Sequence, residues 1–158
     1  MEQNIFYTVS ELRRIIVVKQ SEGKKVVFTN GCFDIIHAGH IKYLTQAKSL
    51  GDILIVGLNS DSSVSILKPM RPIVAQKERA IVLASLNMVD YVVIFDEETP
   101  YETIKELKPD VLVKGGDWKK QDIVGADLVK EVRSLSYIDG VSTTNIINTI
   151  IERYRQRD

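Results

Sequence analysis

The stretch VVFTNGCFDIIHAGH, residues 26–40, decides the fold, because an apolar run leads through a glycine-containing turn onto a helix-forming segment. Val26–Phe28 is typical of a buried strand, and residues 41–48 favour a helix. Backbone N–H groups and the helix dipole attract an anion at such a helix start. His37 and His40, the only histidines of the chain, flank Gly39 at this point. The simplest interpretation is a pair of phosphate ligands.

The same alternation of strand and helix continues along the chain. Three further apolar runs predict strands, at Ile53–Val56, Tyr91–Ile94 and Val111–Val113. Helix-length segments lie between them, around residues 40–50, 76–87 and 100–108, and a last one follows Gly140. An N-terminal helix should begin at a capping box formed by Thr8 and Glu11 and run through about Lys19.

Short β-branched runs that are apolar throughout are typical of a parallel sheet covered on both faces. We therefore predict one α/β domain over residues 1–158. Its core is a doubly wound, Rossmann-like parallel sheet of about five strands with helices on both faces. The N-terminal helix, about residues 8–20, packs on this domain or leads into it.

Charge and composition limit the possible partners. Lys plus Arg and Asp plus Glu both number 21, so the formal net charge is zero and does not indicate nucleic acid or a membrane surface as a partner. The apolar runs are far shorter than the roughly 20 residues of a membrane-spanning helix. Met1–Asn4 does not resemble a signal peptide, and a single cysteine, Cys32, fits a reducing compartment. We expect a cytoplasmic protein with neither nucleic acid nor membrane as partner.

Polar and glycine residues gather where the predicted strands end. The segments are Thr29–Asp34, Asn59–Asp61 and Lys114–Trp118, together with Asp139–Asn145 before the last helix. Ligands of doubly wound sheets bind beyond the carboxyl ends of the strands. Loops are often polar for no other reason than exposure, but four such loops at one rim favour a ligand site.

These motifs resemble the nucleotidyltransferase superfamily that carries an HxGH motif and a C-terminal Ser-Thr-Thr motif. Phe28–His40, Leu112–Trp118 and Val141–Ile147 are similar to the adenylyltransferase domain of bacterial ADP-heptose synthesis. The likeness extends from about Lys25 to Ile150. That domain is often fused behind a sugar kinase, for which 158 residues leave no room, so the resemblance implies the stand-alone form.

The resemblance implies an enzyme that joins ATP and D-glycero-β-D-manno-heptose 1-phosphate to give ADP-heptose and pyrophosphate, for lipopolysaccharide or surface-glycan precursors. The phosphate nucleophile has a second pKa of about 6, so it needs charge relief and no general base. Mg²⁺ would arrive with the nucleotide, with no metal site in the protein. A homo-oligomer is also possible.

The resemblance also implies roles for individual residues. The catalytic residues would be His37, His40 and Lys68. Nucleotide would be bound by Asn30, Gly31, Cys32, Phe33, Gly39, Gly116, Asp117, Gly140, Val141, Ser142, Thr143 and Thr144. The second substrate would be bound by Asp34, Arg71, Arg79, Lys114 and Trp118. Gly39 would keep a side chain out of the space that the phosphate enters.

Several of these residues have simpler interpretations. The two histidines with Cys32 and Asp34 could instead bind zinc, and the Ser-Thr-Thr run could only cap a helix. Lys68 could be a solvated lysine, and Arg79 a salt-bridged surface residue.

Asp34 would order the acceptor loop or bind the sugar, and Asp117 would meet ribose hydroxyls, unless both are turn aspartates. Trp118 is a stacking wall for the base or a packed aromatic residue.

Two alternatives remain open. One is a related transferase on another acceptor, such as glycerol 3-phosphate with CTP or FMN with ATP. The other is a nucleotide-binding module without turnover. The related glycerol-phosphate cytidylyltransferases have an arginine where Tyr137 stands here.

Overall fold

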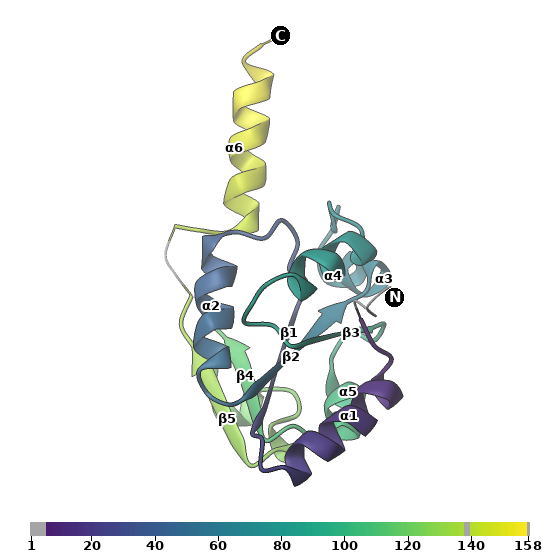
Figure 1. Ribbon diagram of the computed structural model, residues 1–158. Helices are drawn as coiled ribbons and strands as arrows, with labels where there is room; N and C mark the ends of the chain where they lie inside the picture. Colours follow the sequence, from purple (N-terminus) through teal and green to yellow (C-terminus); the bar gives the residue numbers. More distant parts are fainter. Residues whose placement is uncertain (1–5, 138–139, 158) are drawn as a thin grey trace.

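The computed structural model describes residues 6–137 and 140–157 (Figure 1). Its helices are α1 (Val9–Ser21), α2 (Ala38–Lys48), α3 (Asp61–Leu67), α4 (Gln76–Ala84), α5 (Tyr101–Leu107) and α6 (Thr143–Arg155), with short 3₁₀ helices η1 (Lys120–Asp122) and η2 (Ala126–Leu128). Its strands are β1 (Val26–Gly31), β2 (Ile53–Asn59), β3 (Tyr91–Phe95), β4 (Val111–Gly115) and β5 (Glu131–Leu135).

The five strands form one parallel sheet in the order β3-β2-β1-β4-β5. The chain therefore winds outward from β1 to β3 and then crosses back to β4 and β5. Such a reversal opens a crevice between β1 and β4 at their carboxyl ends. The predicted doubly wound α/β class is confirmed.

Two apolar cores lie on opposite faces of this sheet, because successive side chains of a strand point to opposite sides. Val27 of β1 faces the core that Leu44 of α2 and Leu83 of α4 complete. Val26 and Phe28 face the other core, with α1 and α5. Every residue of the neighbouring β2 is buried. The non-alternating apolar runs are thus explained by helices on both faces.

The helix boundaries follow local signals. Thr8 caps α1 through a reciprocal capping box with Glu11, as predicted. Helix α5 ends at Leu107, just before Pro109. The first strand continues to Gly31 and α2 begins at Ala38, so the turn between them is short, residues 32–37, and contains Cys32, Asp34 and His37.

Two elements were not predicted individually. Helix α3 has only seven residues and three serines among them. Strand β5 is an edge strand in which Val132 is the one buried residue. Each is too short and too polar to show a period in the sequence.

Helix α6 differs from the others because it projects away from the sheet and its covering helices (Figure 1). Thr143, its first residue, is its one buried residue among those described. Ile150, Ile151 and Tyr154 on the same helix are exposed.

Candidate active site

A cavity of about 820 Å³ opens at the carboxyl edge of the sheet. Most of the predicted site residues line it: Asn30, Gly31, Cys32, Phe33, Asp34, His37, Gly39, His40, Lys68, Arg71, Lys114, Gly140, Val141, Ser142, Thr143 and Thr144. Gly116, Asp117, Arg79 and Trp118 do not line it. Segments more than 100 residues apart in sequence thus meet at one place, which is where a doubly wound sheet binds its ligand.

The two histidines are held by the first turn of α2. The backbone N–H of Gly39 donates to Nδ1 of His37 at 3.1 Å, and the backbone N–H of His37 donates to Nδ1 of His40 at 3.2 Å. The ring centroids are 3.9 Å apart. The pair therefore forms its own capping box, in which imidazole nitrogens replace the usual hydroxyl and carboxylate.

This bonding fixes the protonation state of both rings. A nitrogen that accepts an N–H carries no proton, so each neutral ring has its proton on Nε2. Burial is the main cause that lowers the pKa of His40 to about 4, and charge repulsion from the neighbouring His37 and Lys68 contributes to the shift. Burial also lowers the pKa of His37. Near neutral pH both rings are neutral hydrogen-bond donors through Nε2.

Gly39 has a structural role that the sequence did not reveal. A Cβ there would lie 2.8 Å from Cε1 and 2.9 Å from Nδ1 of the His37 ring. Such contacts are far inside van der Waals distance, so only glycine permits this ring position. The glycine makes room for an imidazole, and the predicted room for phosphate stays a prediction.

Cations and helix-cap donors surround the histidines. Lys68 is exposed and caps the end of α3. Lys114 is half-buried, and burial lowers its pKa, an effect that the positive charge of Lys68 reinforces. A bound polyanion would offset both effects.

The Ser-Thr-Thr run provides the other wall of the cavity. Ser142 caps α6 by accepting the backbone N–H of Asn145 at 3.1 Å. Thr143 donates its hydroxyl to the backbone carbonyl of Asp34 at 2.6 Å, while Thr144 is exposed. Capping and a position on the cavity wall thus coexist. Asp139, the first residue of the predicted segment, lies outside the described residues.

The segment after β4 is arranged around two glycines. Tyr137 lines the cavity, and its ring covers Gly115 so closely that a Cβ would lie 2.8 Å from it. Gly116 has a φ of +99°, which favours glycine. The indole N–H of Trp118 donates to the Gly115 carbonyl at 2.9 Å. Asp117 is exposed beside it. Base stacking on Trp118 and ribose contact by Asp117 stay predictions.

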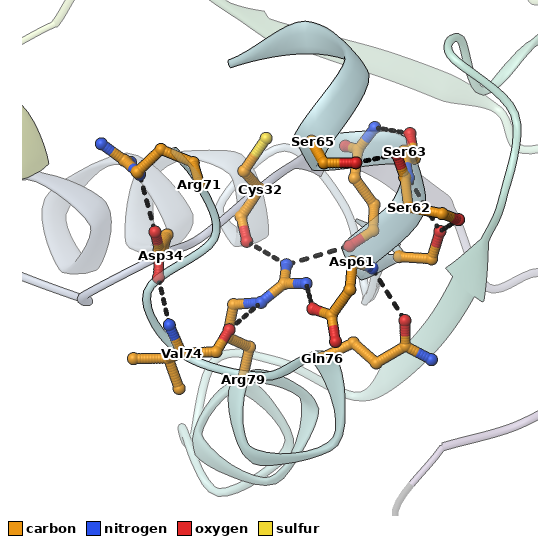
Figure 2. A network of polar contacts seen from close by, with 12 residues as sticks. Cys32, Asp34, Asp61, Ser62, Ser63, Ser65, Arg71, Val74, Gln76 and Arg79 are labelled. Atoms are coloured by element: carbon orange, nitrogen blue, oxygen red, sulfur yellow. Dashed lines mark hydrogen bonds and ion pairs between the residues drawn. The ribbon is translucent and has the colours of Figure 1, made fainter. Parts of the chain in front are cut away.

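Arg79 is neither in the cavity nor on the surface, because its side chain is only 1% exposed. Its guanidinium donates to the backbone carbonyls of Cys32, Asn59 and Val74 and forms an ion pair with Asp61 at 2.8 Å (Figure 2). The predicted substrate contact therefore finds no support in this geometry. Arg79 instead joins the ends of β1 and β2 to the segment before α4.

Other residues line the cavity without having been predicted. They include Lys42, Tyr43 and Gln46 of α2, Glu98, Thr99 and Pro100 after β3, and Tyr137. Positions 39, 42–43 and 46 share one face of a helix, so the helical period counted from Gly39 could have identified the first group. No sequence signal marks the segment after β3.

Among residues 6–137 and 140–157, no group of three or more His, Cys, Asp or Glu side chains is placed to hold a metal ion. Both Nδ1 atoms of the histidine pair are already occupied by backbone N–H groups. The zinc interpretation thus lacks a ligand set in the part of the chain that the structure describes. No helix of that part is long and apolar enough to cross a membrane.

Comparison with known proteins adds independent information. A family model described as cytidylyltransferase-like matches residues 28–151. The bifunctional protein HldE of Syntrophotalea carbinolica is 53% identical over 150 residues, which cover 92% of this chain and 31% of that protein. HldE of Aliarcobacter butzleri is 57% identical over 146 residues, with the same two coverages. The chain thus spans about a third of the curated relatives that it matches.

A solved structure is also similar. The lipopolysaccharide core biosynthesis protein of Thermoplasma volcanium superposes with a TM-score of 0.65 and is 31% identical, over 74% of this chain and 100% of that one. The match to the family model, residues 28–151, covers the sheet from Phe28 onward and all the motifs from Phe28 to Thr144, but not α1. This chain belongs to the cytidylyltransferase-like family.

Proposed function

We propose that this domain is a nucleotidyltransferase that joins ATP and D-glycero-β-D-manno-heptose 1-phosphate to give ADP-heptose and pyrophosphate. One observation carries the proposal. Two neutral imidazoles present Nε2–H groups at a helix start, in the same cavity as Lys68, Lys114 and the Ser-Thr-Thr run. Such a set suits a polyphosphate and provides no general base.

The reaction needs no base because the attacking group is a phosphate monoester. Its oxygen, largely ionised at neutral pH, forms a bond to the α-phosphorus of ATP, and the bond to the β-phosphate oxygen breaks. Negative charge then grows on the α-phosphate and on the leaving pyrophosphate. Fixed donors aimed at that charge lower the barrier.

Each group of residues has a distinct task in this scheme. The Nε2–H groups of His37 and His40 donate to the α-phosphate as its charge grows. Lys68 and Lys114 attract the anionic substrates into the cavity. Ser142 and Thr144, at the start of α6, hold the outer phosphates of the nucleotide.

Mg²⁺ bound to the nucleotide phosphates would neutralise part of the charge on the departing pyrophosphate. The residues around the cavity fit this division of labour, because cations and N–H donors prevail there and the carboxylate of Asp34 is engaged with protein groups. We expect the phosphates to provide most of the metal ligands.

The choice of acceptor rests on resemblance. The relatives are named bifunctional HldE, and this chain matches one third of them, as expected for one of two joined activities. The solved relative is named for lipopolysaccharide core biosynthesis. The Lys114–Trp118 and Thr144–Ile147 motifs favour the same branch. A cytoplasmic location and a homo-oligomer also stay predictions, and light scattering would test the latter.

A grid of nucleotides and acceptors tests the proposal. Pyrophosphate release should be fastest for ATP with the β-heptose 1-phosphate, well ahead of CTP with glycerol 3-phosphate or ATP with FMN. Omission of either substrate should abolish release. If another pair is faster, the acceptor assignment is wrong, and if no pair reacts, the domain binds nucleotide without turnover.

A further inference from the structure

The carboxylate of Asp34 is fully buried beside the cavity and engaged with one neighbouring segment. Its oxygens accept the backbone N–H groups of Ile73 at 2.8 Å and Val74 at 2.9 Å. Arg71 donates from Nε at 2.7 Å (Figure 2), and the Asp34 side chain is 0% exposed. Three donors from residues 71–74 occupy it, so a sugar hydroxyl has no direct access.

The main chain of the same residue binds a second segment. The Asp34 carbonyl accepts the hydroxyl of Thr143, the first residue of α6. Asp34 itself belongs to the turn that leads to His37. Three parts of the cavity wall therefore meet at this residue: the turn before α2, residues 68–74 and the start of α6.

The backbone around Asp34 is held in a costly conformation. Phe33 and Ile35, its neighbours on both sides, have φ values of 46° and 52°. Bulky and β-branched residues rarely adopt this left-handed region, because the Cβ atom comes too close to the backbone carbonyl oxygen there. Surrounding contacts must stabilise such a turn, and they include those of Asp34, the core packing of Phe33 and the hydrogen bond from Arg79 to the Cys32 carbonyl.

The segment held by the carboxylate carries Lys68. This lysine follows α3 directly and lies three residues before Arg71. Arg79 fixes the far end of the same segment by donating from Nε to the Val74 carbonyl at 2.8 Å. The position of the Lys68 backbone relative to the histidines therefore depends on contacts made at residues 71–74.

We propose that Asp34 is a positioning residue that anchors the Lys68 segment to the histidine turn and to α6, so that Lys68 and the histidine pair reach the same phosphate. This inference rests on the proposed nucleotidyl transfer. It assigns to the Asp34 carboxylate no contact with sugar or nucleotide.

The test compares Asp34→Asn with Asp110→Asn. Asp110 likewise accepts a backbone N–H, that of Val26 at 2.8 Å, but precedes β4 at the opposite edge of the sheet. Asp34→Asn should lower kcat/KM roughly tenfold, within the 10²-fold that a displacement of about 1 Å can cost. Asp110→Asn should change kcat/KM less than about twofold.

The double variant with Lys68→Ala separates positioning from direct contact. If Asp34 acts through Lys68, Asp34→Asn should lower kcat/KM less than about threefold in the Lys68→Ala background, because interacting residues give non-additive effects. A full tenfold loss in that background would overturn the proposal. So would a rise in KM for the sugar phosphate that is equally large in the Lys68→Ala background, the signature of a direct sugar ligand.

Hydrogen–deuterium exchange provides a readout that needs no turnover. The N–H groups of Ile73 and Val74 should exchange on the order of tenfold faster in Asp34→Asn, and faster in Arg71→Gln, which leaves Asp34 intact. Asp110→Asn should leave them unchanged. Unaltered exchange in both site variants would refute the anchoring. If exchange is faster in both site variants but the native domain is inactive on every substrate pair, the anchoring role is supported and the proposed function is refuted.

Discussion

Helices α2 and α6 both present their first turn to the same cavity, yet they are fixed in opposite ways. The first turn of α2 is tied internally by two N–H to Nδ1 contacts, and Leu44 and Ala47 anchor the helix in the core. Helix α6 is anchored at Thr143 and then projects outward (Figure 1). In the proposed function, this difference suits α2 to the chemistry, since its donors keep their places, and α6 to nucleotide binding.

The largest effect should follow loss of a histidine. His40→Ala or His37→Ala should lower kcat about 10²–10³-fold, or roughly 3–4 kcal/mol, with a much smaller change in the KM for ATP. Steady-state kinetics measures kcat and KM, and thermal melts show whether each variant is as stable as the native protein. Thr45→Ala, on the exposed face of α2, is the control. A normal melt with normal kcat would remove that histidine from the mechanism.

Loss of Lys68 should weaken binding more than chemistry. Lys68→Ala should raise the KM of a phosphate-bearing substrate roughly ten- to hundredfold, because a hydrogen bond to a charged group contributes about 1.5–3 kcal/mol. Titration of each substrate separately shows which one it contacts. The assignment fails if both KM values stay unchanged.

A smaller effect should follow loss of the Thr143 hydroxyl, which anchors the start of α6. Thr143→Val leaves the buried Asp34 carbonyl without its hydroxyl donor, at a cost of about 1–3 kcal/mol shared between stability and position. We expect a several-fold rise in the KM for ATP. Thr143→Ser keeps the hydroxyl and should behave like the native protein. Equal kinetics in both variants would show that α6 is placed by other contacts.

The smallest effect concerns pH and stability. The pKa of His40 is about 4 in the fold, against 6.5 for a free imidazole. Between these values the unfolded chain binds a proton that the folded chain excludes, so stability falls as the pH is lowered from 6.5 to 4. His40→Asn should show a shallower decline of melting temperature over this range. A steeper or equal decline would contradict the lowered pKa.

The sequence predicted those features that have a local cause. Apolar runs and cap residues define β1, β2, α1 and α2, since period and capping are encoded within a few neighbouring residues. The strand-end polar segments meet as predicted because parallel strands share one carboxyl edge.

Contacts between distant segments escaped prediction. Arg79 is buried because carbonyls from three separate segments surround it, and nothing near Arg79 in the sequence encodes them. For the same reason the sequence left Asp34 open between a sugar ligand and a loop anchor. The partner of Gly39, the His37 ring, depends on a side-chain rotamer that spacing alone does not specify.

The central claim is that the two histidines work as neutral donors through Nε2. Because the chain has only two histidines, a long-range ¹H–¹⁵N spectrum contains two imidazole patterns, and His37→Asn assigns them. We predict that at pH 7 both rings are neutral with the proton on Nε2, and that His40 stays so down to about pH 5. A His40 ring that carries its proton on Nδ1, or that titrates near pH 6.5, would contradict the account.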